Sequence, residues 1–266
     1  MTTSQLHIFK EELQTICTNV GQFIRTEMNE VTTEQIQEKE RNSLVSYVDK
    51  EAENLIVKEL RQLIPDAGYI TEEDSTENSV KENMWIIDPL DGTTNFLYKI
   101  PHFCTSIALS VGGEVVLGIV YDIMQQTAYT AIKGEGAWEN NIPMRVKSNA
   151  DQKQAIVGTG FPYKRSDSID PTMALLKHCI LNYRGIRRIG SAALDLAFVA
   201  AGKMDIFYER TLNIWDVAAG ALLVEEAGGQ VTDYWGKDGY LENGTIISSN
   251  KILHQDILQA IQDHLN

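Results

Sequence analysis

The fold of this chain is decided by the stretch Trp85-Ile86-Ile87-Asp88-Pro89-Leu90-Asp91-Gly92-Thr93-Thr94-Asn95-Phe96. Met84 and the first three residues of this stretch form an apolar run, 84–87, which is short enough to be a buried strand. Pro89 cannot donate to a sheet ladder, so we expect the strand to end at Asp88. Asp91 follows three residues later. The pattern therefore places two carboxylates on one tight turn at the end of a buried strand.

Two anions held this close repel each other, and the arrangement is comfortable only with a cation between them. Thr93, Thr94 and Asn95 are expected to begin a helix, whose free amides would suit a phosphate group. Hard oxygen ligands beside such a helix start indicate magnesium and phosphoryl chemistry. The alternative is a plain surface turn, because Asp, Gly and Pro also favour turns for local reasons.

The bulk composition restricts the partners of the chain. With 266 residues, 43% of them hydrophobic, it can bury a large core as one large domain or two smaller ones. A net charge of −14 disfavours nucleic-acid backbones and anionic membranes as partners. Cys17, Cys104 and Cys179 form no close-spaced motif and are expected to be buried thiols in a reducing cytoplasm. The sequence shows neither an apolar run of ~18 residues nor a signal-peptide pattern.

The first half of the chain is predicted to be two helices followed by a mainly antiparallel sheet. Apolar residues keep helical spacing over 4–28 and again from Val48 to Leu63, before Pro65. The polar stretch 29–42 between the helices is predicted to be a mobile loop. Strands are expected at 68–71, 84–87, 106–111, 114–121 and 127–132, with Gly112-Gly113 as a hairpin turn.

The chain becomes polar from about Asn140 to Gln152, which predicts a boundary between an α+β domain of residues 1–145 and an α/β domain of residues 146–266. Strands alternate with helices in the second domain, as is typical of α/β folds. Ser191 is expected to cap one of these helices. The predicted strands are 155–159, 186–189, 205–208 and 245–248, and the helices are 171–181, 192–201, 217–227 and 252–264.

Three further acidic features have simple structural explanations. Glu72-Glu73-Asp74 follow a predicted strand, and an acidic triplet is usually a solvated loop. Asp49 lies in the first turn of the second helix, where a carboxylate stabilises the helix dipole. Asp216 stands at the start of the helix 217–227, where it can act as an ordinary N-cap.

Two motifs nevertheless resemble one known family over essentially the whole chain. Asp88-Pro-Leu-Asp-Gly-Thr-Thr-Asn-Phe96 resembles the signature of the inositol monophosphatase family of magnesium-dependent, lithium-sensitive phosphatases. Trp215-Asp-Val-Ala-Ala-Gly220 is similar to the second signature of that family, at the expected separation. A Glu-Glu pair precedes the first signature, although Thr71 stands where the family normally has Gly. The resemblance implies a layered αβαβα sandwich of the sugar-phosphatase type, which combines α/β and α+β features.

The resemblance also implies the ligands of two magnesium ions. Glu72, Asp88 and the Leu90 carbonyl would hold one ion. Asp88, Asp91 and Asp216 would hold the second, with Asp88 bridging. A weaker third ion would depend on Glu72 and water, and lithium would inhibit by displacing a magnesium ion. Leu90 replaces the commoner Ile, which matters little because only its backbone oxygen takes part.

Catalytic roles follow from the same resemblance. Thr93 and Asp49 would orient or deprotonate the attacking water, and Glu73 would support them from behind the metal ligands. The amides of Gly92 and Thr93 would hold phosphate oxygens.

The resemblance places the alcohol of the substrate between the two domains. Asp91, the Ala192 backbone, Glu209 and Asp216 would contact it there. Glu209 could equally be a surface carboxylate after a strand, but its place seven residues before Asp216 matches the family's inositol contact. Asn213 departs from the His that other members carry.

These features favour a magnesium-dependent phosphate monoester hydrolase that acts on inositol monophosphate, as a cytoplasmic homodimer. The alternatives within the fold are phosphatases of NADP, fructose-1,6-bisphosphate or phosphoadenosine phosphate. An alternative of another class is a non-catalytic regulatory protein, such as bacterial members proposed to touch the transcription machinery. The −14 charge argues against direct nucleic-acid binding, and the intact ligand set argues against a dead enzyme. A calcium-binding module fails because no EF-hand spacing surrounds Asp88.

Overall fold

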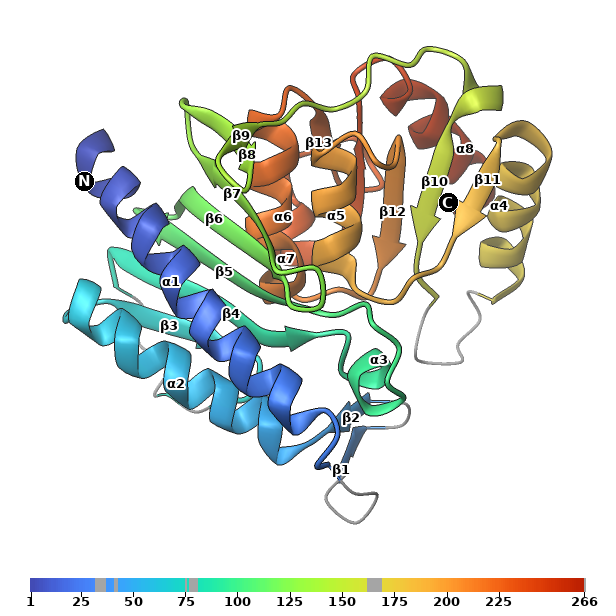
Figure 1. The fold of residues 1–266 in the computed structure, drawn as a ribbon. Coiled ribbons are helices and arrows are strands. Elements are labelled where there is room, and N and C mark those ends of the chain that lie inside the picture. The colour runs from blue at the N-terminus through green and yellow to red at the C-terminus, as the bar shows by residue number, and fades with distance from the viewer. Residues whose placement is uncertain (32–36, 41–42, 75, 77–80, 162–168, 266) are drawn as a thin grey trace.

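The protein folds into five layers in which helices alternate with sheets (Figure 1). The computed structural model describes residues 1–31, 37–40, 43–74, 76, 81–161 and 169–265. The layers are, in order, helices α1 and α2, a seven-stranded sheet, helices α5 and α6, a five-stranded sheet, and helices α4 and α8. The predicted αβαβα sandwich is therefore confirmed.

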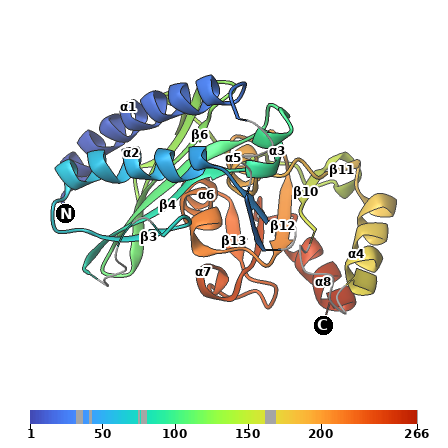
Figure 2. The same cartoon turned by 90° about the horizontal axis from the view of Figure 1, so that it is seen from below.

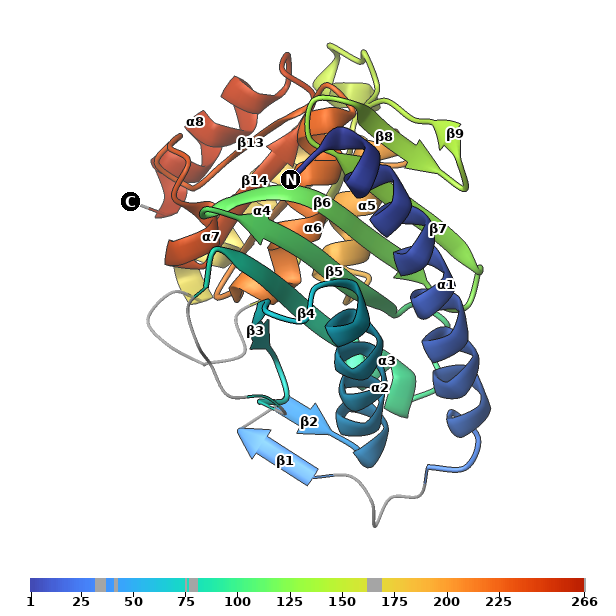
Figure 3. The same cartoon turned by 90° about the vertical axis from the view of Figure 1, so that its left-hand side faces the viewer.

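The first outer layer consists of α1 (Thr3–Glu27) and α2 (Tyr47–Leu63), which lie side by side on one face of the seven-stranded sheet (Figures 2 and 3). Leu13, Ile24 and Ile56 on their apolar stripes are fully enclosed. Burying one such side chain contributes about 1.5–3 kcal/mol, so these stripes are core rather than a binding face. Among the described helices, none is long and apolar enough to cross a membrane.

The seven-stranded sheet is antiparallel except for its first pair of strands, β3 and β4. The hairpin between β5 and β6 turns at Gly112-Gly113, as predicted. The short helix α3 (Thr93–Leu97) follows directly after β4. The spatial order of the strands is β3 (Gly68–Thr71), β4 (Asn83–Asp91), β5 (Cys104–Val111), β6 (Glu114–Asp122), β7 (Thr127–Ile132), β8 (Gly136–Glu139) and β9 (Ile142–Pro143).

The middle layer consists of α5 (Ala192–Ala200) and α6 (Ile214–Glu226), whose residues are buried nearly all round. A helix enclosed on every side needs small residues where its neighbours approach most closely. A Cβ atom added at Gly220 of α6 would lie 2.6 Å from Cβ of Leu196 in α5. The Ala-Ala-Gly part of the second sequence motif therefore has a packing role.

The five-stranded sheet is mixed, with the order β11-β10-β12-β14-β13. β10 is parallel to both of its neighbours, whereas β14 is antiparallel to both of its own. Helices α4 (Ile169–Asn182) and α8 (His254–Leu265) cover the outer face, and α7 (Tyr240–Asn243) is a single turn. The strands are β10 (Ile156–Thr159), β11 (Gly185–Arg187), β12 (Ile206–Arg210), β13 (Gln230–Thr232) and β14 (Thr245–Ser249).

The prediction that Pro89 ends its strand is wrong, because β4 continues to Asp91. The pairing with β5 shifts register between Asp88 and Asp91, so Pro89 lies in a bulge, one of the few places where a strand tolerates proline. The Pro89 carbonyl accepts a hydrogen bond from Thr105 Oγ1 at 2.9 Å. A side-chain donor on β5 thus helps to hold the proline within the sheet.

Short strands elsewhere also depart from the predictions. Part of the predicted loop 29–42 forms β1 (Gln37–Glu40), which pairs antiparallel with β2 (Ser43–Val45). The rest of that loop lies partly outside the described residues. β8, β9 and β13 were not predicted, because two to four residues are too few to display an alternating pattern.

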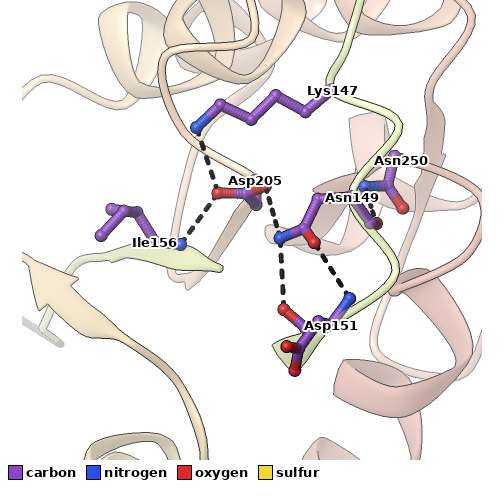
Figure 4. Close-up of polar contacts among 6 residues, drawn as sticks. All are labelled: Lys147, Asn149, Asp151, Ile156, Asp205 and Asn250. Carbon is purple, nitrogen blue, oxygen red and sulfur yellow. Dashed lines mark hydrogen bonds and ion pairs between the residues drawn. The ribbon is translucent and has the colours of Figure 1, made fainter. Parts of the chain in front are cut away.

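The chain passes from one sheet to the other between β9 and β10, where the buried carboxylate of Asp205 fastens the connection (Figure 4). It accepts hydrogen bonds from Asn149 Nδ2 at 3.2 Å and from the Ile156 amide at 2.9 Å. Lys147 Nζ lies 3.4 Å away as an ion pair. Because α5 and α6 pack between the two sheets, the division into domains 1–145 and 146–266 stays a prediction.

Candidate functional site

The bulge at the end of β4 brings Asp88 and Asp91 to the same place. In a regular strand, residues three apart point to opposite faces of the sheet. The register shift adds a residue between them, and their carboxylate oxygens lie within 4.8 Å of each other. The Leu90 amide donates to Asp88 Oδ1 at 2.9 Å, which fixes the turn from inside. Pro89 therefore helps to shape the acidic pair.

Asp216 joins this pair from the first turn of α6, and one oxygen from each of the three carboxylates lies within 4.8 Å of the others. Asn213 is the N-cap of α6, and Asp216 forms the second half of a capping box. Its Oδ2 accepts from the Asn213 amide at 2.6 Å. Asp216 thus caps its helix and also faces the acidic cluster.

The turn after β3 carries Glu72 and Glu73 to the same edge of the sheet. The Glu72 amide donates to the Ile87 carbonyl at 3.2 Å, and the Glu72 carboxylate is near enough to raise the pKa of Asp88. The Glu73 amide donates to Glu53 Oε2 at 2.8 Å. Glu53 lies on α2 and is fully buried, so a carboxylate of the first layer holds this turn in position.

Asp49 and Thr93 contact each other beside the acidic cluster. Thr93 Oγ1 lies 3.0 Å from Asp49 Oδ1 and 3.1 Å from the Leu90 carbonyl oxygen, and its single proton can go to only one of them. Asp49 Oδ2 accepts from the Ser46 amide at 2.9 Å and from Ser46 Oγ at 2.7 Å. Asp49 therefore caps α2 with one oxygen and reaches Thr93 with the other.

The second sheet and its helices supply the other side of the site. Ala192 is the first residue of α5, and the neighbouring Ala193 amide donates to Asp91 Oδ2 at 2.7 Å. Glu209 is buried on β12. Gly92 has φ +97°, and a Cβ there would lie 3.1 Å from the His102 carbonyl oxygen. The turn after Asp91 therefore requires glycine both for its backbone conformation and for space.

The carboxylates of the site are poorly solvated and close to one another. Burial, Glu72, Asp91 and Asp216 together raise the pKa of Asp88 well above its usual range. Burial raises the pKa of Asp216 to about 8, and Asp91 adds to the rise. Burial raises the pKa of Asp91 to about 6 even though hydrogen bonds from Ser191 and Ala193 oppose it. Such a cluster becomes stable in its ionised form only when a cation neutralises it.

The donor set suits a hard divalent cation. All the candidate ligands are oxygens. Asp88, Asp91 and Asp216 form the cluster, the Glu72 carboxylate is near enough to affect Asp88, and the Leu90 carbonyl belongs to the bulge between Asp88 and Asp91. Magnesium prefers a few carboxylates and keeps several waters. The residues present therefore fit magnesium.

Sequence reasoning missed four residues of this site. Ser191 was predicted only as a helix cap, yet its Oγ donates to Asp91 Oδ2 at 2.7 Å. Arg188 was not predicted either, and it lies close enough to Glu209 to oppose the rise in the pKa of Glu209, to about 8, that burial causes. Cys104 and Glu53 carry no local signal, because their partners lie far away in the sequence.

Comparisons with known proteins agree with one another. A model described as the inositol monophosphatase family matches residues 5–266. The inositol-1-monophosphatase of Mesorhizobium japonicum is 38% identical over 247 residues, covering 92% of this chain and 93% of that protein. The Nus factor SuhB of Pasteurella multocida is 40% identical over 229 residues, covering 86% of each chain. The crystal structure of extragenic suppressor protein suhB from Bartonella henselae has a TM-score of 0.90 and 35% identity, covering 94% of this chain and 97% of that one.

Proposed function

The chain belongs to the inositol monophosphatase family and is a phosphatase, and we propose that it hydrolyses inositol monophosphate to inositol and phosphate with magnesium. The observation that carries the proposal is the convergence of Asp88, Asp91 and Asp216 within 4.8 Å, with Glu209 nearby on β12. Relatives named inositol-1-monophosphatase, at 38% and 40% identity over most of the chain, support the choice of substrate.

We propose two main magnesium positions in this cluster. Glu72, Asp88 and the Leu90 carbonyl would hold the first, and Asp88, Asp91 and Asp216 the second. A third, weaker ion would depend on Glu72, and lithium would inhibit by displacing magnesium. When bound, the ions would neutralise phosphate charge and lower the pKa of a coordinated water.

The remaining steps belong to protein groups. The 3.0 Å contact between Thr93 and Asp49 supports a role for this pair in orienting the attacking water and taking its proton. Glu73 would steady the turn of Glu72. The amides of Gly92 and Thr93 would hold the phosphate, since phosphoryl transfer depends mainly on positioning and charge stabilisation.

The alcohol would lie between the two sheets. Asp91, Asp216, the Ala192 backbone and Glu209 would contact its hydroxyl groups. Glu209 is buried, and the charges of Asp91 and Arg188 are close enough to change its pKa, which Asp91 raises and Arg188 lowers. A carboxylate in this place can accept hydrogen bonds from several hydroxyls of a cyclitol, whereas it would repel a second phosphate.

A phosphate-release panel with magnesium tests this proposal. The substrates are inositol 1-phosphate, fructose-1,6-bisphosphate, NADP, phosphoadenosine phosphate and an aryl phosphate. We expect inositol 1-phosphate to have the highest kcat/KM. Glu209→Ala should lower kcat/KM for inositol 1-phosphate by an amount that corresponds to about one to three kcal/mol of lost transition-state stabilisation, the scale of charged hydrogen bonds left unmade. The kcat/KM for the aryl phosphate should change little. The exposed Glu242→Ala on α7 is the matched control.

Three outcomes of the panel would count against the proposal. Higher activity on a dinucleotide or bisphosphate that survives Glu209→Ala would favour the rival substrates. The guanidinium of Arg188 lies close enough to Glu209 and Asp91 to affect their pKa values. Because a guanidinium binds phosphate groups well, Arg188 is the residue that would favour a bisphosphate substrate. An equal loss on the aryl phosphate would make Glu209 structural. No release from any ester would refute the proposed activity.

A regulatory role is the second candidate, because relatives at 40% identity are named Nus factor SuhB. The net charge of −14 disfavours direct contact with nucleic-acid backbones, so a protein partner is the more suitable choice. Binding of the purified chain to purified RNA polymerase, measured with and without RNA, tests this role.

The three cysteines are buried free thiols, which supports the proposed cytoplasmic location.

A further inference from the structure

Ser191 lies where the end of β4 meets the start of α5. We propose that Ser191 is a positioning residue for Asp91: its hydroxyl holds one carboxylate oxygen so that the other faces the cation. The inference rests on the proposed function, because it requires magnesium at the carboxylate cluster. It goes beyond that function by making the second half of the chain responsible for orienting a ligand of the first half.

The hydrogen bonds around Asp91 Oδ2 carry the proposal. Ser191 Oγ and the Ala193 amide each donate to this oxygen at 2.7 Å. One donor is the N-cap of α5 and the other lies in its first turn, whereas Asp91 comes from β4. A carboxylate oxygen with two short donors is fixed in rotation. The second oxygen is then left to face Asp88 and Asp216, with which Asp91 forms the acidic cluster.

The distances distinguish this role from ordinary helix capping. An N-cap serine normally accepts from an amide in the first turn, but the Leu194 amide lies 3.4 Å from Ser191 Oγ. The contact with Asp91 is 0.7 Å shorter (3.4 Å against 2.7 Å). Asp91 itself accepts from an amide at the positive end of α5, where a carboxylate is stabilised. The start of α5 is therefore completed by a residue of the other sheet.

Cys104 lies beside the hydrogen bond between Ser191 and Asp91. Its Sγ lies 3.5 Å from Ser191 Oγ and 3.9 Å from Asp91 Oδ2, and it is fully buried. The hydroxyl has one hydrogen, and the carboxylate is a stronger acceptor than a thiol. The proton of Ser191 thus points at Asp91.

Magnesium titrations followed by thermal unfolding test the proposal without using activity. Ser191→Gly is the main variant, because it removes the hydroxyl together with Cβ while glycine stays nearly as good an N-cap as serine. We expect the magnesium concentration at half-maximal stabilisation to rise by about 10- to 100-fold, the usual cost of losing a partner of a metal ligand. Ser191→Thr, which keeps the hydroxyl, should restore a midpoint near that of the wild type.

Two controls separate positioning from stability. Thr2 caps α1 with its side chain, and α1 belongs to the outer helix layer, so Thr2→Ala should lower stability without moving the magnesium midpoint. Ser191→Ala should lower stability and also raise the midpoint. An unchanged midpoint in both Ser191→Gly and Ser191→Ala would overturn the proposal and leave only a helix cap. A wild-type protein that does not respond to magnesium would instead overturn the metal site itself.

Discussion

Two carboxylates of this site, those of Asp49 and Asp216, each cap a helix and also contact the rest of the site. Asp49 caps α2 through Oδ2 and meets Thr93 through Oδ1. Asp216 completes the capping box of α6 and still lies in the acidic cluster. A position at the start of a helix therefore does not argue against a role in chemistry. Because the helix fixes the side chain, it also reduces the freedom lost when a ligand binds.

Asp88→Asn tests the central ligand. The side chain is buried and its Oδ1 accepts from the Leu90 amide, a bond that an asparagine oxygen can keep. We expect kcat to fall by more than about 100-fold, since a shared ligand should matter more than the partners of ligands. Thermal stability in EDTA should not fall, because one of several clustered charges is removed. Exposed Asp66→Asn is the control, and near-normal turnover of Asp88→Asn at saturating magnesium would contradict the ligand assignment.

Asp49 and Thr93 form a pair that a double-mutant cycle can test. Thr93→Ala and Asp49→Asn should each lower kcat far more than they raise KM, because both act on the nucleophile rather than on substrate binding. If they act on one water, the double variant should be little worse than the more damaging single variant. Fully additive losses would show that Asp49 only caps α2 through Ser46.

At the scale of elements, long periodic segments could be predicted and short ones could not. α1, α2, α5, α6 and α8 follow local periodicity or capping, which the sequence displays directly. β9 and β13 are held by their neighbours rather than by their own pattern. The continuation of β4 past Pro89 depends on a bulge against β5, and only the pairing reveals it.

The same distinction applies to the site. Asp88 and Asp91 are only three residues apart in the sequence, so their meeting could be predicted, although a bulge rather than the expected turn brings it about. Ser191 meets Asp91 across 100 positions, and Glu73 meets Glu53 across 20. No local pattern encodes those contacts. The resemblance to a family gave the expected ligands and did not include Ser191 or Glu53.

Gly220→Ala tests the packing role of the second motif. The new Cβ would meet Cβ of Leu196 at 2.6 Å, and neither helix backbone can move freely between two sheets. We expect a loss of about 1–3 kcal/mol in the free energy of unfolding, the usual cost of overpacking a core, measured by urea denaturation. Gly185→Ala on the edge strand β11 has only ordinary contacts, at 3.4 Å or more, and should be close to neutral. Equal effects of the two changes would mean that α5 and α6 can separate.

At the scale of the whole molecule, α4 offers a surface for the predicted homodimer. Ile169, Met173, Ile180 and Leu181 on this outer helix are all exposed, the last at 72%. Large apolar side chains exposed together on one outer helix are a common feature of interfaces. We expect the wild type to sediment as a dimer and the double variant Ile180→Glu with Leu181→Glu to sediment as a monomer. Ile8→Glu on α1, another exposed isoleucine, should leave the dimer intact, and a monomeric wild type would refute the prediction.

The dependence of stability on pH should differ with and without magnesium. In the metal-free protein the pKa of Asp91 is raised to about 6 and that of Asp216 to about 8, against about 3.9 in an unfolded chain. A raised pKa means that the folded state binds the proton more tightly, so this contribution to stability is complete below about pH 4 and is lost as the pH rises to about 8.

Magnesium binds the ionised carboxylates, so its own stabilisation grows over the same range of pH. We therefore expect the difference in Tm between magnesium and EDTA to widen steadily from about pH 5 to pH 8. Taking the difference cancels groups that titrate identically in both conditions. Asp88→Asn should narrow the difference at every pH, because one shared ligand is lost. A difference that stays constant with pH would mean that the carboxylates are already ionised without metal, and the cation would then not be what makes their clustering stable.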